Sequence, residues 1–542
     1  MAPRLKKKST GPFTKFRSND PFGQAMKTSF VFHFCCLAFF AILAFPSLCC
    51  AAESHPVSPA LSNAREPAPN FVWIIADDMS PDTGAYGATD IRTPHLDALA
   101  AAGQRFTRAY ATAPVCSSSR SAFILGCYQT TTGLHAHDVE NPQPLAAPYE
   151  PLPTLLRKAG WFVTNVAAQG TVRSGRVIKK GKTHYNFAHD DATMFDGDDW
   201  RNRLPGQPFF AQFQITEPHR PFSIPEEFDV VKLSAIKLPA NYPEHPLMRR
   251  DWYAYQRSVE VVDQRVGAIM DQLKAEGVLD KTIVMFFADH GRPMPWGKQW
   301  LSVEGLQVPL IITGLHIKAR STEDRLVSLI DLAPSMLQLA NLPTPAWMEG
   351  KAVLGDVFPE RTHIFAARDR CGDAQDRIRA AIGLDALLVH NFHPELSRLN
   401  WSSYKEDAYP GMPLLRVLST TGRLLESQSR WLTATRPEFE FYDLKQDPQG
   451  VRNIATDDVI ANVANTMRTA MDDWIKSTGD HGALPDPLTE PSLAEIQKSK
   501  RGDYQRTWAK RLGKPEPTDE ERLTWWEKSY DTSSPASEKS PD

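Results

Sequence analysis

Cysteine is scarce in this sequence, which has seven cysteines among 542 residues. Four of the seven lie near the N-terminus, at positions 35, 36, 49 and 50. The other three, Cys116, Cys127 and Cys371, are odd in number and far apart, which excludes a disulfide framework. An isolated cysteine of this kind is therefore a candidate for chemistry.

An excess of positive charge is also missing. The formal net charge is -3 at pH 7, so no electrostatic attraction to nucleic acid is expected, and nucleic acid is excluded as a partner. The hydrophobic fraction of 42% is ample for a packed globular protein. A chain of 542 residues exceeds what one core usually supports, so two domains are the default expectation.

The N-terminal segment has the pattern of an export signal. Lys27 precedes an apolar run over residues 30–48, and small residues follow this run at positions 49–52. Met26 is a second candidate initiator, because residues 1–25 are polar and basic, unlike a leader. A membrane anchor is the alternative, but Pro46 and the small residues that close the run favour a cleaved signal.

We therefore predict a signal peptide with its upstream segment over residues 1–52 and a Pro/Ser/Ala-rich linker over residues 53–67. This signal implies an exported protein, either periplasmic or extracellular, or lysosomal if the source is eukaryotic.

Strand and helix patterns alternate over the next part of the chain, residues 68–360. The predicted strands are 71–76, 161–166, 282–288 and 308–313, and the predicted helices are 94–102, 152–158, 259–273 and 326–339. This alternation predicts an α/β domain with a large, mostly parallel sheet sandwiched by helices.

The pattern changes after residue 360. Short strands are predicted at 363–367, 386–392 and 439–444, followed by a helix over 457–477. Residues 361–483 therefore form a predicted smaller α+β domain. Residues 484–542 are charged and proline-rich, with Trp525 and Trp526 as anchors, and they are predicted to form an extended polar tail.

Two predicted strands end in side chains that bind metals. The strand over 71–76 ends in Asp77 and Asp78, and the strand over 282–288 ends in Asp289 and His290. Sites in open α/β sheets lie at the carboxyl ends of strands, and carboxylate oxygens suit calcium or magnesium. Acidic pairs also cap helices, but the second cluster favours a metal site.

Cys116 and Arg120 lie between these two clusters, in the segment Cys-Ser-Ser-Ser-Arg. A thiolate phosphatase loop needs its arginine six positions after the cysteine. That position is Ala122, so this class of phosphatase is excluded.

These residues resemble the signature of the formylglycine-dependent sulfatases of the alkaline phosphatase superfamily, Cys-x-Pro/Ala-x-Arg followed by Thr-Gly. Ser118 takes the place of Pro or Ala, and Leu125 takes the place of Thr before Gly126. The resemblance extends from Asn70 to about residue 455 and is nearest to the sulfamidase-like and bacterial glycan sulfatases. Further matching segments are Thr93-Pro94-His95, Gly181-Lys182-Thr183-His184, Glu217-Pro218-His219, Asp289-His290-Gly291, Gly297-Lys298 and Tyr442-Asp443-Leu444.

The resemblance implies an alkaline phosphatase-like fold and the cofactors of the family. Cys116 would be converted to 3-oxoalanine (formylglycine) by a formylglycine-generating or equivalent maturation enzyme. A divalent cation, Ca²⁺ with Mg²⁺ as the alternative, would share a site with the residue at 116. Its other ligands would be Asp77, Asp78, Asp289 and His290.

The resemblance also implies roles for the remaining motif residues. Arg120, Lys182 and Lys298 would hold the sulfate oxygens and stabilise the charge of the transition state. His184 is the predicted base, and His219 is the predicted acid with Lys298 as its helper. Without the resemblance, the two lysines would be read as surface residues and His219 as a loop histidine.

The predicted activity is removal of O-sulfo or N-sulfo groups from a sulfated saccharide. A phosphate or phosphonate ester hydrolase of the same superfamily is one alternative, although the Asp-x-x-x-His spacing of two-zinc phosphatases would put a histidine where Pro293 stands. An inactive protein that only binds sulfated glycan is the other. The oligomeric state stays open, and several residues outside this set could also contact substrate: His135, His137, Arg292, Trp296, Arg377 and Arg379.

Overall fold

A computed structural model describes residues 68–531, with gaps at 169–171, 174–175, 178, 223–229, 356–357 and 484–492. The predicted signal peptide and linker lie outside the described residues, so export stays a prediction. Among the described helices, none is both long and apolar enough to cross a membrane.

The described part of the chain contains a seven-stranded sheet in the order β10-β2-β9-β8-β1-β7-β4. The strands β8, β1, β7 and β4, which follow one another to one edge of the sheet, are parallel, which confirms the predicted α/β sheet. β9 is antiparallel to both β8 and β2, and β10 is parallel to β2. The bounds are β1 Asn70–Ala76, β2 Gly103–Phe106, β4 Phe162–Ala167, β7 Phe209–Ile215, β8 Thr282–Ala288, β9 Leu310–Thr313 and β10 Ser321–Glu323.

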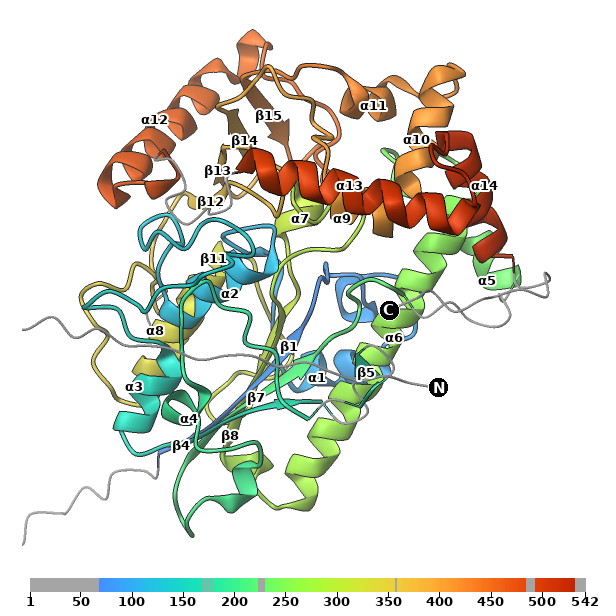
Figure 1. The fold of residues 1–542 in the computed structure, drawn as a ribbon. Coiled ribbons are helices and arrows are strands. Elements are labelled where there is room, and N and C mark those ends of the chain that lie inside the picture. The colour runs from blue at the N-terminus through green and yellow to red at the C-terminus, as the bar shows by residue number, and fades with distance from the viewer. Residues whose placement is uncertain are drawn as a thin grey trace, which may run out of the picture. The chain divides into compact units, whose positions relative to one another are not determined.

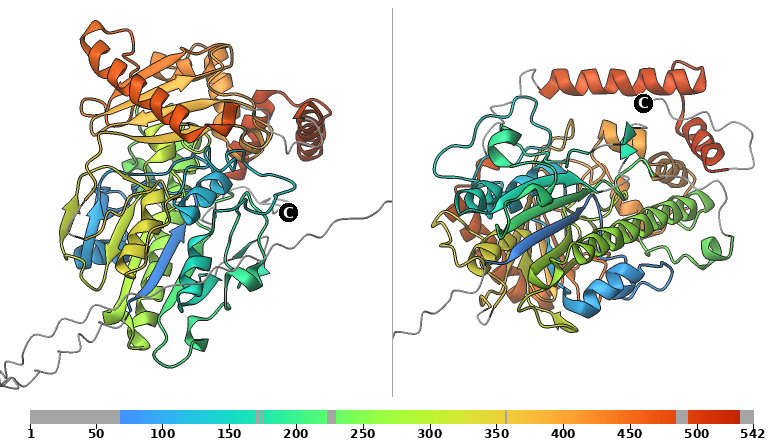
Figure 2. Two further views of the ribbon diagram at one scale, coloured as in Figure 1. Left: turned by 90° about the vertical axis from the view of Figure 1, so that its left-hand side faces the viewer. Right: turned by 90° about the horizontal axis from the view of Figure 1, so that it is seen from below.

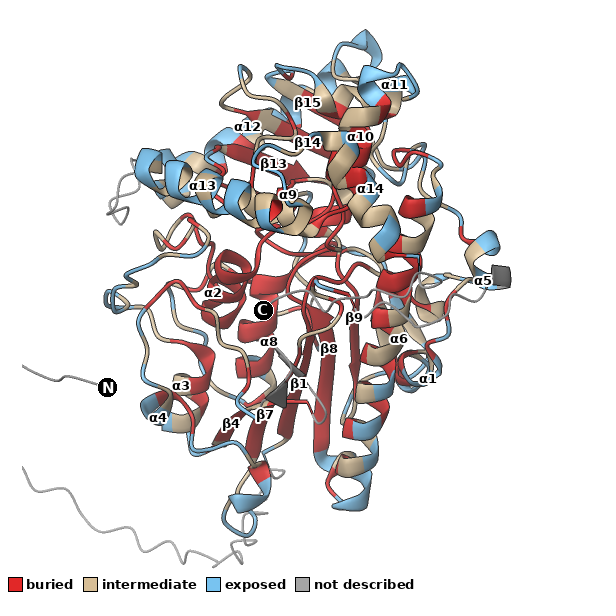
Figure 3. Ribbon diagram, turned by 45° about the vertical axis from the view of Figure 1, so that its right-hand side comes forward, coloured by how far each residue is buried: buried red, intermediate tan, exposed pale blue. Residues whose placement is uncertain are grey.

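Helices cover both faces of this sheet, as the strand and helix alternation predicts. Figures 1 and 3 show α1 and α6 on one side, and α2, α3 and α8 on the other. The bounds are α1 Pro94–Ala102, α2 Cys116–Leu125, α3 Leu152–Lys158, α6 Pro246–Ala275 and α8 Leu332–Leu339. The predicted helix over 326–339 is shorter than expected, because residues 327–328 form the strand β11.

The core between α2 and the sheet is aromatic. The Trp73 ring packs edge-on against Phe210, with ring centroids 5.3 Å apart, and against Phe287 at 5.2 Å. Phe123 of α2 joins the same group, with its centroid 5.8 Å from that of Trp73. Edge-to-face pairs of this kind stabilise a core beyond their buried area, so α2 is firmly seated over β1 and β8.

A second, four-stranded antiparallel sheet follows in the chain, in the order β12-β13-β14-β15, as the prediction of a smaller α+β unit requires. Figures 1 and 2 show it with α12 at one end of the large sheet. The bounds are β12 Ile364–Arg368, β13 Ile378–Ile382, β14 Ala386–Asn391, β15 Phe439–Asp443 and α12 Ala461–Thr478. The domain boundary at residue 360 stays a prediction.

The prediction of an extended tail over 484–542 is wrong where the structure describes this segment. Residues Leu493–Leu512 form α13 and residues Asp519–Ser529 form α14. Thr518 and Glu521 form a reciprocal capping box at the start of α14. Trp508 and Leu523 are buried, and these few apolar anchors among many charges gave no amphipathic signal in the sequence.

Shorter elements connect these parts. They are β3 Ala109–Tyr110, β5 Val172–Arg173, β6 Arg176–Val177, β11 Val327–Ser328, α4 Asp191–Met194, α5 Val230–Ala235, α7 Val303–Leu306, α9 Ser403–Ala408, α10 Gly411–Thr420 and α11 Glu426–Ser429.

Candidate active site

The carboxylates at the ends of β1 and β8 lie side by side because the two strands run parallel in register. Ala76 is the partner of Ala288 in that register, so Asp77 and Asp289 leave the sheet at the same edge. The backbone N–H of Asp78 donates to Oδ1 of Asp289 over 3.0 Å. The sequence prediction that both strand ends meet is therefore confirmed.

Cys116 lies at the first position of α2 and faces these carboxylates. Its Sγ atom is 3.3 Å from Nε2 of His290 and 3.7 Å from Oδ1 of Asp78. Burial raises the pKa of the Cys116 thiol, but Lys182, Lys298 and His290 together hold that pKa well below its usual value. A helix N-terminus also favours negative charge at this position.

The side chains around Cys116 fit a divalent cation. Ligand atoms of Asp78, Cys116, Asp289 and His290 all lie within 4.8 Å of one another. Asp77 belongs to a second, overlapping group with Asp78, Cys116 and His219. Burial, and then the charge of Asp77, raises the pKa of Asp289 to about 7. Such a concentration of buried carboxylates is what a hard cation neutralises.

Arg120 contacts the same carboxylates from behind. Its Nε atom lies 2.9 Å from Oδ2 of Asp289, and one Nη atom lies 3.0 Å from Oδ1 of Asp77. The other Nη atom donates to Oε1 of Gln214 over 2.9 Å. The guanidinium therefore orients two predicted metal ligands, and a direct contact between Arg120 and sulfate stays a prediction.

Two lysines bring positive charge to the pocket side of the carboxylates. Nζ of Lys182 lies 2.6 Å from Oδ2 of Asp77, and Nζ of Lys298 lies 2.8 Å from Oδ2 of Asp78. Burial lowers the pKa of both ammonium groups, but the adjacent carboxylates raise each pKa above its usual value. Both lysines stay protonated, which suits them to bind an anion.

His184 forms a pair with a residue that the sequence analysis missed. Its Nε2 atom lies 2.6 Å from Oδ1 of Asp138, and Nδ1 of His137 lies 3.3 Å from the other carboxylate oxygen. Nδ1 of His184 is buried and has no hydrogen-bond partner among the described residues. Burial lowers the pKa of His184, but Asp138 and Cys116 reverse this effect and raise it above its usual value. Asp138 belongs to no motif, so only the structure could identify it.

His219 approaches the site from the loop after β7. Its Nε2 atom lies 3.9 Å from Oδ2 of Asp78, and its Nδ1–H donates to the backbone oxygen of Arg220. Burial and then the charge of Lys298 lower the pKa of His219. The ring is therefore neutral here, and its Nε2 atom could act as an acid only after an anion in the pocket favours protonation.

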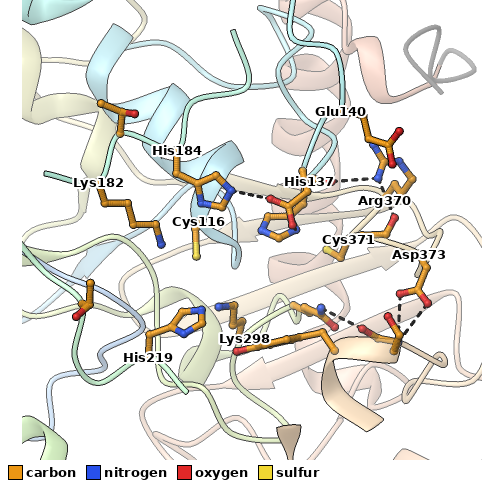
Figure 4. Close-up of a pocket in the computed structure, with 18 of the residues that line it drawn as sticks. Cys116, His137, Glu140, Lys182, His184, His219, Lys298, Arg370, Cys371 and Asp373 are labelled. Carbon is orange, nitrogen blue, oxygen red and sulfur yellow. Dashed lines mark hydrogen bonds and ion pairs between the residues drawn. The ribbon is translucent and has the colours of Figure 1, made fainter. Parts of the chain in front are cut away.

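A pocket of about 850 Å³ connects this cluster to solvent. Figure 4 shows Cys116, Lys182 and His184 on one side of it, and Glu140, Arg370 and Asp373 on the other. The second group also escaped the sequence analysis, because its members come from unrelated loops. Other lining residues include His137, Asp138, Lys179, Lys180, His219, Lys298, Cys371, Ser402, Tyr404, Ile496 and Lys500.

Three arginines and a tryptophan noted in the sequence lie outside the lining of this pocket. Arg292 pairs with Asp82 at 3.2 Å, and the Trp296 N–H donates to the backbone oxygen of Asn241. Arg379 is fully buried in β13 and pairs with Asp369 and Asp480, while Arg377 pairs with Asp480 as well. Each of these side chains binds within the protein and lies outside the pocket lining, so contact with substrate, which the sequence left open for them, stays untested.

Comparison with known proteins gives consistent matches. The sequence profile described as Sulfatase matches residues 69–342. An ulvan-active sulfatase of Formosa agariphila is 29% identical over 473 residues, which cover 77% of this chain and 76% of the relative. The human N-sulphoglucosamine sulphohydrolase is 25% identical and matches 78% of this chain and 93% of its own. A structure solved in complex with D-glucosamine-2-N,6-O-disulfate superposes with a TM-score of 0.54 at 18% identity, and covers 78% of this chain and 99% of its own.

Proposed function

This chain belongs to the sulfatase family, and from that premise we propose that it removes O-sulfo or N-sulfo groups from a sulfated carbohydrate. The names of two relatives, an ulvan-active sulfatase and an N-sulphoglucosamine sulphohydrolase, support a saccharide as the substrate. The choice between an ester and an N-sulfo bond is left to experiment.

One observation carries the proposal: Cys116 is buried at the start of α2, with its sulfur against His290 and Asp78 and two lysines beside it. This is the position at which sulfatases carry formylglycine. We propose the same conversion of Cys116, by a formylglycine-generating or equivalent maturation enzyme, and a Ca²⁺ ion held by Asp77, Asp78, Asp289 and His290. When bound, such an ion supplies positive charge next to residue 116 and lowers the pKa of an adjacent hydroxyl.

Other residues of this chain would bind the sulfate group, position the carboxylates and take up a proton. Lys182 and Lys298 line the pocket and would bind oxygens of the sulfate group, whose charge grows in the transition state. Arg120 keeps Asp77 and Asp289 in place. The buried Nδ1 atom of His184 is the position at which a proton would be taken up.

The leaving group needs a proton, which His219 would supply. Nε2 of His219 is near Asp78 and faces the pocket, with Nδ1 fixed by a backbone oxygen. A sulfate anion bound between the lysines would favour protonation of this ring. Lys298, whose Nζ atom lies 5.0 Å from the centre of the Tyr404 ring, would assist.

The test is sulfate release from a panel of sulfated saccharides by protein from a host with a formylglycine-generating enzyme. Phosphate and phosphonate monoesters are assayed beside them, and the Cys116→Ala variant is the matched control. We expect the wild-type protein to release sulfate and the Cys116→Ala variant to release none. The wild-type peptide that carries residue 116 should contain an aldehyde. Preferential release of phosphate or phosphonate would contradict the proposal. An unmodified cysteine with saccharide binding but no turnover would make the protein a glycan-binding relative.

Export is part of the proposal, to the periplasm or the exterior, or to the lysosome if the source is eukaryotic. The apolar run over residues 30–48 supports a cleaved signal. N-terminal sequencing of the mature protein should give a start near residues 51–53, and a retained leader would contradict it.

A further inference from the structure

Helix α13 borders the pocket that holds Cys116. Ile496 and Lys500 of this helix line the pocket, together with the catalytic candidates at its inner end. The two residues are four positions apart, so they lie on one face of the helix. In Figures 1 and 3, α13 crosses the molecule beside the small sheet and above α2. The C-terminal segment thus reaches a site built more than 370 residues earlier in the chain, at Cys116.

Side chains along one face of α13 contact Asp373, Trp401 and α9, and of these partners Asp373 lines the pocket. Gln497 Nε2 donates to the backbone oxygen of Asp373 over 3.0 Å. The Arg501 guanidinium lies 4.1 Å from the centre of the Trp401 ring, and Trp508 is fully buried. Arg511 pairs with Asp407 of α9 at 2.5 Å. Positions 497, 501, 508 and 511 follow helical spacing, so one face of α13, with Trp508 as its buried residue, contacts the protein, and the neighbouring face borders the pocket.

The following helix, α14, holds this arrangement in place. Arg416 of α10 lies 2.9 Å from Oδ2 of Asp519, and it also pairs with Glu406 of α9 at 2.7 Å. Just after α14, the Tyr530 hydroxyl donates to Asp251 over 2.8 Å. The same carboxyl group pairs with Arg220, whose backbone oxygen binds His219. The two C-terminal helices are therefore integral to the structure around the pocket.

The wall of the pocket that α13 completes carries a buried carboxylate and an exposed ammonium group. Asp373 is buried, and both of its carboxylate oxygens lie 3.2 Å from the backbone nitrogen of Ser403. Ser403 is the main donor to this carboxylate, through its backbone and its side chain, and a carboxylate with about four lone-pair positions keeps acceptor capacity toward the pocket. Lys500 is exposed at the pocket lining, and its charge acts on Asp373.

We infer that α13 forms a saccharide-binding wall, in which Lys500 binds an anionic substituent of the sugar and Asp373 accepts a hydrogen bond from a sugar hydroxyl. Ile496 provides the apolar surface between them. The inference rests on the proposed sulfatase function for the kind of ligand, and it extends that function by naming the element that recognises the sugar. The anion is either a uronate carboxylate or a second sulfate.

The test compares variants on a large and a small substrate. Lys500→Met removes the charge, Ile496→Trp fills the outer pocket, and Lys498→Met changes an exposed lysine of the same helix that does not line the pocket. On heparin-derived sulfated disaccharides, we expect KM to rise about 5- to 10-fold for Lys500→Met and more than about 10-fold for Ile496→Trp, with kcat little changed. Para-nitrophenyl sulfate has neither a sugar hydroxyl nor a second anionic group for this wall to bind, so all three variants should match the unmodified protein on it.

Two disaccharides separate the sources of the anion. One keeps the uronate and lacks a second sulfate, and the other carries a second sulfate and an esterified uronate. The one whose KM responds to Lys500→Met identifies the group. Equal KM values for all variants on both disaccharides, or equal losses on the disaccharides and on para-nitrophenyl sulfate, would overturn the inference.

A binding measurement distinguishes this inference from the proposed function. Titration calorimetry with the same disaccharides uses the Cys116→Ala protein, alone and combined with Lys500→Met. Weaker binding in the combined variant supports the saccharide wall even if the unmodified protein releases no sulfate, which would refute the proposed function alone. Unchanged binding in the combined variant would refute the wall, whatever the turnover.

Discussion

Nε2 of His184 lies 2.6 Å from Oδ1 of Asp138, which leaves Nδ1 of the same ring buried and without a hydrogen-bond partner among the described residues. This pair has the arrangement of a base held by a carboxylate. The carboxylate fixes the ring orientation and stabilises the imidazolium that forms when Nδ1 takes up a proton. The side chain of Asp138 is 55% exposed, so water weakens its effect on His184.

The Asp138→Asn variant should therefore lose activity through His184. Asp138 helps raise the pKa of His184 above its usual value, against the effect of burial. A base acts in its neutral form, so activity rises with pH through this pKa. Loss of the carboxylate lowers the pKa and should move the rising limb of the kcat profile to lower pH. The limiting kcat should fall about 10- to 100-fold.

The matched control is Asp198→Asn, an exposed aspartate outside the pocket lining. It should leave both the pH profile and kcat unchanged. A fall in kcat for Asp138→Asn without any movement of the profile would show that Asp138 supports the loop and does not tune His184.

Lys182 and Lys298 lead to a prediction about the end of the pocket that would bind the sulfate group. Each ammonium group lies within hydrogen-bond distance of a strand-end carboxylate and lines the pocket. Removing either charge by Lys182→Ala or Lys298→Ala should lower kcat/KM for a sulfate ester about 100- to 1000-fold. Steady-state kinetics at several salt concentrations give the measurement.

Lys281→Ala serves as the control, because Lys281 is exposed before β8 and does not line the pocket. The thermal midpoint of each variant is measured in parallel. If kcat/KM falls in proportion to the folded fraction alone, the lysines stabilise the fold and do not bind sulfate.

The inner half of this site was predictable from the sequence, because parallel strands bring their ends to one edge. Asp77 and Asp289 each follow an apolar run, and the register of β1 and β8 puts them together. Cys116 and Lys298 belong to short motifs with recognisable spacing. Local patterns of this kind can be recognised in the sequence alone. The parallel strands then bring the residues that follow them to the same edge of the sheet.

The outer half was not predictable, for a physical reason. Asp138, Asp373 and Lys500 come from separate segments that meet only through tertiary packing, and none has a local signature. β13 was missed because Arg379 interrupts its apolar run with a charge that is compensated by Asp369 and Asp480. A buried ion pair between distant segments cannot be told from an exposed arginine without the structure.

Removal of divalent cations should abolish activity and lower stability. Three buried carboxylates converge near Cys116, and the pKa of Asp289 is raised by burial and by Asp77. Exchange into EGTA or EDTA should therefore remove sulfate release, and Ca²⁺ should restore it better than Mg²⁺. A cation at 100 times its Kd adds about 2.7 kcal/mol of stability, which a thermal unfolding scan measures.

The Asp289→Asn variant is the control for this experiment. It should unfold at the same temperature with and without Ca²⁺, because one carboxylate of the site is gone. If chelators change neither the activity nor the unfolding temperature of the unmodified protein, this result would argue against a metal at these residues.

Arg379 provides a prediction about stability. The side chain is fully buried, and its guanidinium lies 2.7 Å from Asp480 and 3.0 Å from Asp369, which join β13 to the end of α12 and to the loop that carries Arg370. Arg379→Met would leave these carboxylates without their buried partner, and the expected loss is about 3–5 kcal/mol in the free energy of unfolding. Urea unfolding at neutral pH measures this loss.

The pH dependence gives the sign of the effect. Burial raises the pKa of Asp480, but the hydrogen bonds and charge of Arg379 lower it below its usual value. A carboxyl group with a lowered pKa stabilises the fold above its unfolded pKa, and this contribution is lost as pH falls through the folded pKa. The difference in unfolding free energy between Arg379→Met and the unmodified protein should thus be largest near neutral pH and shrink below about pH 4.

Arg377→Met, which removes a partly exposed partner of Asp480 at 3.4 Å, should cost at most about 1 kcal/mol. Equal losses for both variants, or a loss independent of pH, would show that packing of the side chains, and not the buried charge pair, holds β13 in place.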